Sequence, residues 1–305
     1  PVDTLTNVVE TLHIERKQFV REERIYERVS IANYGTGPVT LPLAFEFDAD
    51  FHDMFEVRGA RRPKRGVRRK PDIGERGVTF RYDGLDGVER SCAIAFSDTP
   101  DRLTANRAEF VYDLAAEGRL DLHVEIGAHE GPPPCGERHR AAAARARWAM
   151  RARQRHGARL TTVGRLFNHW IEKSVAHLAL LTTSMETGPY PYAGISWFST
   201  AFGRDGILTA WQVLWFEPSL AKGVLTYLAA HQAEFASAFR DSQPGKIMHE
   251  MRRGEMAALG EVPFGRYYGG VDTTPLFVAL AGAYATRTGD FAFIEGLWPA
   301  LQRAM

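Results

Sequence analysis

The sequence has little cysteine, no excess of charge of either sign and no long apolar run. Only Cys92 and Cys135 occur among 305 residues, far apart in sequence, which favours reduced thiols in a cytoplasmic protein over a disulfide framework. The formal net charge is +1, which gives the whole chain no electrostatic attraction to nucleic acid or to an anionic membrane. No apolar stretch of about 18 residues and no basic-then-apolar N-terminal signal is present. We therefore expect a cytoplasmic protein with neither nucleic acid nor membrane as a partner.

The remaining composition is that of a globular protein with room for two domains. Hydrophobic residues make up 45% and charged residues 25% of the chain. The sequence starts without Met and stops inside an apparent helix at Met305, so we expect it to be a fragment of a longer protein.

The N-terminal part alternates apolar and polar residues in short runs. Examples are the segments 39–47 (VTLPLAFEF) and 120–126 (LDLHVEI), and clusters of Gly, Asn and Asp separate such runs. Period-two alternation bounded by turn residues is typical of antiparallel strands joined by hairpins. The pattern predicts a β-sandwich domain over residues 1–135.

A change of pattern marks the domain boundary. The run GPPP at 131–134 interrupts the strands, and an Ala- and Arg-rich stretch follows, which predicts a linker helix over 136–160. From residue 161 the apolar residues recur at spacings of three and four, as on helices. The spacing predicts helices over 163–181, 204–216, 218–235 and 274–287, and another that starts near Asp290.

Two connections in this helical domain, 184–203 and 236–271, are much longer than the roughly 2–8 residues that usually join packed helices. Each is followed by a carboxylate at the start of a helix, Asp205 and Asp272. Long structured loops usually carry function. If alternate helix ends lie on one rim, the two loops meet there.

These loops hold the side chains that would bind a sugar. Aromatic rings offer flat faces to the C–H surfaces of sugar rings, whereas charged side chains bind hydroxyls. Glycoside hydrolysis also needs two carboxyl groups, one acting as general acid and the other as base or nucleophile. The candidate substrate-binding residues are Trp197, Phe198, Arg204, Asp205, His249, Glu250, Arg252, Glu255 and Tyr268.

Structural roles explain the same residues equally well when each is taken alone. Asp272 precedes Thr273, Thr274 and Pro275, so it fits a simple helix cap. Arg204 and Asp205 fit a structural ion pair. The aromatic residues fit ordinary packing, and the glutamates fit solvated loop charges.

The joint pattern resembles a known family. The segments 193–206 (AGISWFSTAFGRDG), 245–255 (GKIMHEMRRGE) and 266–277 (RYYGGVDTTPLF) are similar to signature blocks of bacterial glycogen debranching, amylo-α-1,6-glucosidase-like proteins. The segment 49–59 (ADFHDMFEVRG) resembles the block that characterises the β-rich domain of that family. The resemblance implies a β-sandwich followed by the first part of an (α/α)6 barrel over 161–305, the six-hairpin glycosidase fold, and inverting hydrolysis of α-glucosidic bonds.

The resemblance also implies roles for individual residues. Arg204 and Asp205 match an Arg-Asp pair that holds terminal glucose hydroxyls in glucoamylase-like enzymes. Asp272 is similar in position to the general acid of six-hairpin enzymes. The general base of this superfamily is a glutamate late in the barrel, which places it beyond Met305. No cofactor is implied.

Three functions therefore stay open. The first is an α-glucosidase acting on branches of glycogen or another α-glucan, or on a small α-glucoside. The second is another six-hairpin enzyme, such as a trehalase-like or glucosylglycerate-type hydrolase or a phosphorylase, because a fold does not name a substrate. The third is a glycan-binding fragment without catalytic activity.

Two further features are interpreted as structural. The segment 61–70 (RRPKRGVRRK) has seven basic residues in ten, but no nucleic-acid-binding module accompanies it, which favours a solvated hairpin loop. His169, His177 and His231 stand on predicted helices without the spacing of metal ligands, so no metal site is expected.

Overall fold

The computed structural model describes residues 11–305, which form two compact units with separate hydrophobic cores. The first unit contains the described residues up to His52 together with Gly59–Trp148, and the second contains Asp53–Arg58 and Ala149–Met305. The boundary at Trp148 falls between the predicted limits at residues 135 and 160. Residues 1–10, the start of the predicted β-sandwich domain, lie outside the described part of the chain.

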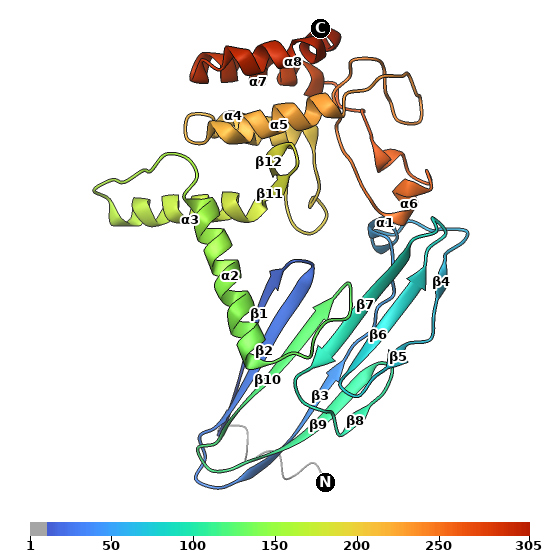
Figure 1. Cartoon of the computed structure of the whole chain (residues 1–305), viewed down its shortest axis with the longest axis vertical. Coiled ribbons are helices and arrows are strands. Elements are labelled where there is room, and N and C mark those ends of the chain that lie inside the picture. Colours follow the sequence, from blue (N-terminus) through green and yellow to red (C-terminus); the bar gives the residue numbers. More distant parts are fainter. Residues whose placement is uncertain (1–10) are drawn as a thin grey trace. The chain divides into compact units, whose positions relative to one another are not determined.

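The first unit is built from two antiparallel sheets (Figure 1). The larger has the strand order β1-β2-β10-β7-β6-β4, with β5 also paired to β6, and the smaller has the order β3-β9-β8. The larger sheet consists of β1 (Leu12–Arg21), β2 (Arg24–Asn33), β4 (Val67–Arg68), β5 (Asp72–Ile73), β6 (Gly77–Asp83), β7 (Glu89–Phe96) and β10 (Arg119–Gly127). The smaller consists of β3 (Val39–Glu46), β8 (Arg102–Leu103) and β9 (Arg107–Leu114).

The core of this unit forms from side chains of both sheets. The larger sheet contributes Ile31 and Phe96, and the smaller contributes Phe110, all of them buried. The ring of Phe96 lies 5.3 Å from that of Phe110 and 5.4 Å from that of Phe45. Successive side chains of a strand point to opposite faces, so alternation lets one face of each sheet bury its apolar residues. The predicted antiparallel β-sandwich is confirmed.

Helix α2 (Gly136–Gln154) follows strand β10. At its start Arg138 donates to Glu125 at 2.7 Å, and His139 packs edge-on against His123 with the ring centres 5.2 Å apart. Burial lowers the pKa of both histidines, which keeps them neutral at pH 7. The predicted linker helix extends to residue 160, but α2 ends at Gln154, shortly before Gly157 adopts a positive φ of 87°.

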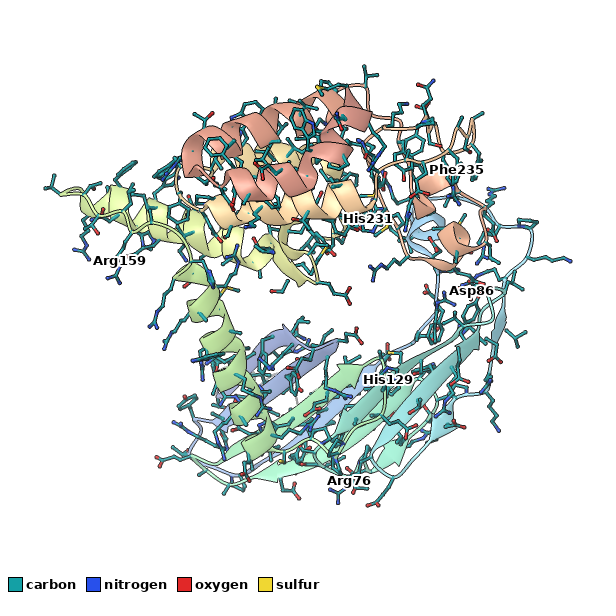
Figure 2. All side chains as sticks on the ribbon, turned by 45° about the horizontal axis from the view of Figure 1, so that its top comes forward. Arg76, Asp86, His129, Arg159, His231 and Phe235 are labelled. Atoms are coloured by element: carbon teal, nitrogen blue, oxygen red, sulfur yellow. The ribbon has the colours of Figure 1, made fainter. Side chains whose placement is uncertain are left out.

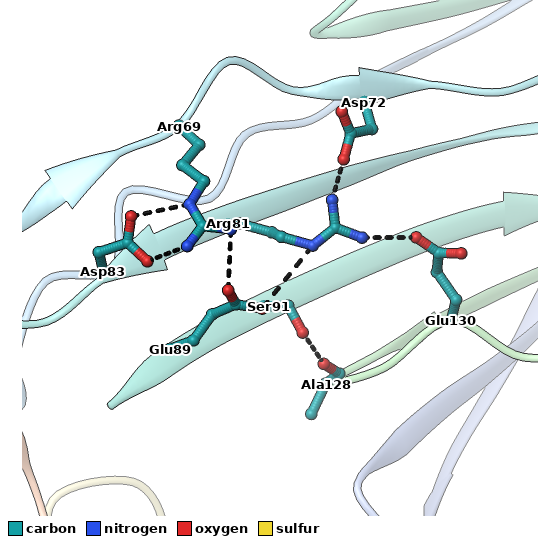
Figure 3. A network of polar contacts seen from close by, with 8 residues as sticks. All are labelled: Arg69, Asp72, Arg81, Asp83, Glu89, Ser91, Ala128 and Glu130. Carbon is teal, nitrogen blue, oxygen red and sulfur yellow. Dashed lines mark hydrogen bonds and ion pairs between the residues drawn. The ribbon is translucent and has the colours of Figure 1, made fainter. Parts of the chain in front are cut away.

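Exposed charged side chains form a network on the larger sheet around strand β6 (Figure 3). Arg81 pairs with Glu130 at 2.9 Å and with Glu89 at 3.9 Å. Arg69, from the basic segment of the sequence, donates to Asp83 at 2.7 Å and pairs with Glu89 at 2.9 Å. Arg69 and Arg81 thus both take part in local ion pairs on the sheet.

The second unit is mainly helical. Helix α5 is central, because its buried Leu220, Val224 and Leu228 belong to a core shared with α4, α7 and α8. The elements of the second unit are α1 (Met54–Val57), α3 (Arg165–Leu181), β11 (Thr182–Met185), β12 (Gly188–Pro191), α4 (Gly203–Gln212), α5 (Pro218–Ala230), α6 (Glu255–Ala258), the 3-10 helix η1 (Pro263–Gly265), α7 (Thr273–Thr288) and α8 (Phe291–Ala304).

The predicted helices are all present, with differences at their ends. The helix predicted to end at Phe216 ends at Gln212, and the one predicted to end at Phe235 ends at Ala230. After Ala230, the buried Gln232 side chain donates to the Gly245 carbonyl at 2.8 Å, which turns the chain away from the helix axis. Figure 2 labels His231 and Phe235 on this departing segment.

The apolar stripe predicted on the helix at 163–181 lies largely on the surface of the described structure. Leu166, Phe167 and Trp170 are exposed, and Ala179 is the buried residue of α3. At the C-terminal end, Leu297 and Leu301 are buried whereas Trp298 is half exposed. Among residues 11–305, none of the helices combines the length and hydropathy needed to cross a membrane.

We predict that a carboxylate in the turn between β6 and β7 stabilises the first unit in a pH-dependent way. Asp86 accepts from Arg90 at 2.9 and 2.6 Å, and these hydrogen bonds hold its pKa below the usual value. Its contribution is therefore present above the normal carboxyl pKa and is lost as pH falls through the lowered one. Asp86→Asn should cost about 1–3 kcal/mol near pH 7.

Denaturant unfolding at several pH values checks this prediction. The difference between wild type and Asp86→Asn should shrink in acid. Asp83→Asn is the matched control, because its carboxylate is 43% exposed and its pair with Arg69 should contribute only about 0–1 kcal/mol. Equal effects of the two substitutions would contradict the assignment.

Candidate active site

The two long loops meet along short antiparallel bridges. Glu250 pairs with Phe202 on one side and with Tyr267 on the other. The Tyr267 amide donates to the Glu250 carbonyl at 2.9 Å, and the Gly203 amide donates to the His249 carbonyl at 2.8 Å. The chain around Glu250 therefore connects the segment before α4 to the segment before α7 through backbone hydrogen bonds.

These bridges bring the N-terminal ends of α4 and α7 together. Gly203 opens α4, and a methyl group on it would overlap the Met248 carbonyl oxygen and lie 2.6 Å from Cγ2 of Thr273. On the other helix the Thr274 hydroxyl accepts from the Ile247 amide at 3.0 Å. Both helix starts are thus anchored to the strand-like segment at 247–250.

Arg204 and Asp272 meet at the junction of the two helices. Nη1 of Arg204 lies 3.4 Å from Oδ2 of Asp272, and the two side chains are 47% and 44% exposed. Asp272 stands at the N-cap of α7, yet its side chain makes no capping hydrogen bond. The simple cap role is therefore wrong for this carboxylate, which points to Arg204 instead.

Asp205 lies in the first turn of α4, beside Arg204 in sequence but not paired with it. Its half-buried carboxylate makes no hydrogen bond or ion pair to any other residue in 11–305. The positive end of the helix dipole favours a negative charge at this position. The alternative of a structural ion pair between Arg204 and Asp205 is wrong, because the arginine pairs with Asp272. The helix junction thus presents one guanidinium and two carboxylates.

The central segment of the second loop adds further polar groups. Glu250 is buried, and its carboxylate accepts from Nε of Arg252. The Arg252 guanidinium also donates to the Trp197 carbonyl at 2.6 Å and lies 5.3 Å from the ring centre of Phe202. Nδ1 of His249 is buried without a hydrogen-bond partner among the described residues. Glu250 and Arg252 thus hold the first loop through a buried ion pair.

The aromatic candidates fall into two groups. Trp197 and Phe198 are 36% and 47% exposed, so their rings are open to a ligand. Tyr268 is buried in the helical core, and its hydroxyl donates to the His231 carbonyl at 2.9 Å. Burial also raises the pKa of Tyr268. This position does not favour the sugar contact expected of Tyr268.

Glu255 is also buried, as the first residue of α6. Its burial distinguishes Glu255 from Asp272, whose side chain is 44% exposed. Both Glu250 and Glu255 are less open to a substrate than Asp205 and Asp272.

The structure adds residues that the sequence-based list of site residues omits. Asp53 accepts from the amides of Phe55 and Met256, Met54 contacts Arg252, and Arg58 lies over the ring of Trp197. The sequence contains a signal for the start of this short helix, because Asp53 and Glu56 have the spacing of a capping box. Both reciprocal hydrogen bonds of that motif are present in the structure.

The arrangement is suited to acid and base chemistry on a polyhydroxylated substrate. It combines two carboxylates and a guanidinium at the helix junction with an imidazole and exposed aromatic rings on the two long loops. Within residues 11–305, no group of three or more His, Cys, Asp or Glu side chains is arranged to hold a metal ion.

We predict that the helix junction tolerates no side chain at Gly203. Gly203→Ala should destabilise the second unit by about 1–3 kcal/mol, because the added methyl group would overlap backbone atoms. Gly282→Ala is the control, since Gly282 lies inside α7 with nothing within 4 Å of an added Cβ. That substitution should stabilise by up to about 1 kcal/mol through helix propensity. Thermal unfolding distinguishes the two, and a neutral Gly203→Ala would contradict the proposed close approach.

Comparison with known proteins finds a family match for the N-terminal part of the chain. Residues 3–125 match the family described as the N-terminal domain of (some) glycogen debranching enzymes. No curated protein matches the chain. The solved structure named "Putative kojibiose phosphorylase from human microbiome" aligns with 96% of this chain at 10% identity and a TM-score of 0.59. This chain spans 42% of that structure.

A second solved structure, a polysaccharide lyase, aligns with 40% of this chain and 20% of its own length, at 15% identity and a TM-score of 0.27. That value is too low to support an argument. The first alignment covers both units and supports the fold alone. Residues 3–125 are therefore similar to the N-terminal domain of some glycogen debranching enzymes, and the chain as a whole shares its fold, strands followed by helices, with the putative kojibiose phosphorylase.

Proposed function

We propose that this chain supplies the sugar-binding side and the general acid of an inverting α-glucosidase site of the amylo-α-1,6-glucosidase type. The substrate is a branch of glycogen or a related α-glucan. The observation that carries the proposal is the meeting of Arg204 and Asp272 at 3.4 Å, on the same pair of helix starts as Asp205. Neither carboxylate is used to cap a helix.

In the proposed reaction Asp272 gives a proton to the glycosidic oxygen as the bond to the sugar breaks. Arg204 and Asp205 hold hydroxyls of the terminal glucose, since charged groups make the stronger hydrogen bonds to hydroxyls. A water attacks from the opposite face of the sugar, activated by a second carboxylate roughly 6.5–9.5 Å from the acid. We assign that base to a glutamate later in the barrel than α8.

The exposed rings of Trp197 and Phe198 are proposed to cover the apolar faces of the sugar. His249 is proposed as a further hydroxyl partner. Glu250 and Arg252 act on the substrate indirectly, because their ion pair holds the Trp197 carbonyl. The proposal needs no cofactor. We also propose a cytoplasmic location, to which the free thiols of Cys92 and Cys135 lend support.

The general acid is tested by Asp272→Asn in the intact protein that contains this chain. Turnover of an ordinary α-glucoside should fall by a factor of about 10² to 10⁴, since the amide cannot donate the catalytic proton as the acid does. An α-glucosyl fluoride needs little protonation, so its hydrolysis should stay much closer to the wild-type rate. Steady-state kinetics on both substrates gives the comparison.

Asp205→Asn is the matched control, because it removes a charge from the same helix junction without removing the proposed acid. It should slow both substrates, through lost orientation and weaker binding. Full activity of Asp272→Asn on the natural glucoside, or equal loss on the fluoride, would exclude Asp272 as the acid. The three glutamates of the second long loop, Glu250, Glu255 and Glu261, would then be the next candidates.

Phosphorolysis is the second candidate, because the chain shares its fold with a structure that bears a phosphorylase name. A phosphorylase uses inorganic phosphate in place of the base-activated water. The assay therefore includes reactions with and without phosphate and identifies the sugar product by nuclear magnetic resonance. We expect β-glucose at the same rate in both; a sugar phosphate formed only with phosphate would replace hydrolysis with phosphorolysis. Saturable glucan binding without turnover would instead favour a glycan-binding module.

A further inference from the structure

The segment Asp53–Arg58 lies among the loops of the second unit, although the residues before and after it in sequence belong to the first. Its short helix α1 spans Met54–Val57. The segment contacts both long loops that carry the proposed sugar-binding residues.

Asp53 joins the starts of two short helices with one carboxylate. Oδ1 accepts from the Phe55 amide at 3.0 Å and so caps α1. Oδ2 accepts from the Met256 amide at 3.1 Å and so caps α6, in the second long loop. A methyl group on Gly254 would overlap Oδ2 of Asp53, so the loop approaches the carboxylate as closely as a glycine allows.

The following side chains of the segment extend this contact. Sδ of Met54 lies 3.5 Å from Nη1 of Arg252, the residue whose guanidinium donates to the Trp197 carbonyl. The Arg58 guanidinium lies 5.6 Å from the ring centre of Trp197 itself. The segment therefore contacts the ring of Trp197 directly through Arg58 and reaches the Trp197 carbonyl indirectly through Arg252.

A chain of rings leads from the segment to His249. Phe55 stacks on Phe264 with centres 5.1 Å apart and planes 14° from parallel. Phe264 packs edge-on against Tyr267 at 5.3 Å, and Tyr267 packs edge-on against His249 at 6.2 Å. Aromatic packing of this kind adds stabilisation that depends on orientation, and these contacts connect Phe55 to His249 through two intervening rings.

We propose that Asp53–Arg58 is a positioning element of the sugar site, with Asp53 as its anchor, and that substrate affinity depends on it. The proposal rests on the proposed function. Asp53 touches no reacting group. It sets the positions of α6, Arg252 and Trp197, so its loss should act on binding more than on the chemical step.

Asp53→Ala in the intact protein should raise KM for the α-glucan about tenfold, while kcat changes by less than about threefold. Such a split indicates lost binding that is shared by ground and transition states. Asp53→Asn keeps one acceptor oxygen but presents an NH2 group where the second amide needs an acceptor. It should therefore raise KM less than Asp53→Ala.

Asp290→Ala is the matched control, because Asp290 caps α8 of the same unit by accepting from Phe293 at 3.3 Å. It should lower Tm as Asp53→Ala does but leave KM unchanged. Hydrogen exchange at the Met256 amide provides an independent measurement, and exchange should be faster in Asp53→Ala than in wild type or Asp290→Ala.

The outcomes separate the two proposals. An active wild type with an unchanged KM in Asp53→Ala overturns the positioning role alone. A wild type that neither binds nor cleaves any α-glucoside overturns the proposed function and, with it, the dependence of affinity on this segment. The exchange comparison then still decides whether Asp53 holds α6.

Discussion

The candidate site depends on the backbone pairing of Glu250 with Phe202 and Tyr267. Long loops lose much conformational entropy when they are ordered, and these hydrogen bonds offset part of that cost. Because the paired segments lead directly into α4 and α7, the same bonds also fix where both helices start. The positions of Arg204, Asp205 and Asp272 thus follow from backbone geometry, and the rigid helices behind them belong to the core around α5.

Two helix N-termini meet at this junction, and each directs the positive end of its helix dipole toward it. Asp205 and Asp272 supply the opposite charge, and Arg204 pairs with Asp272. Because neither carboxylate caps its helix, their oxygen atoms are available to a ligand. Asp272 therefore does not provide the roughly 1 kcal/mol by which a capping side chain stabilises a helix.

The sequence predicted the fold well because the spacing of apolar residues along a strand or helix reflects which of its faces is buried. Strand alternation and helical spacing identified both units, and Pro218 and Gly289 marked helix ends that the structure confirms. Tertiary contacts decided what local pattern could not. The buried Gln232 side chain turns the chain after α5, and the stripe on α3 looked like a core face although Leu166 and Trp170 are exposed. Asp272 fitted a cap equally well until Arg204, far away in sequence, became its partner.

Tyr268 and Asp53 illustrate the same limit from opposite directions. Tyr268 has the residue type expected of a sugar contact and follows an exposed-looking loop, yet its hydroxyl is satisfied by the His231 carbonyl inside the core. Asp53 carries a capping-box signature that predicts a local role, yet its second oxygen binds Met256, more than half of the chain away. A carboxylate has more acceptor capacity than one helix cap uses. The second carboxylate oxygen of Asp53 accepts from the start of another helix, at Met256, so a residue with a local capping motif also makes a long-range contact. The sequence does not indicate which helix this second contact involves.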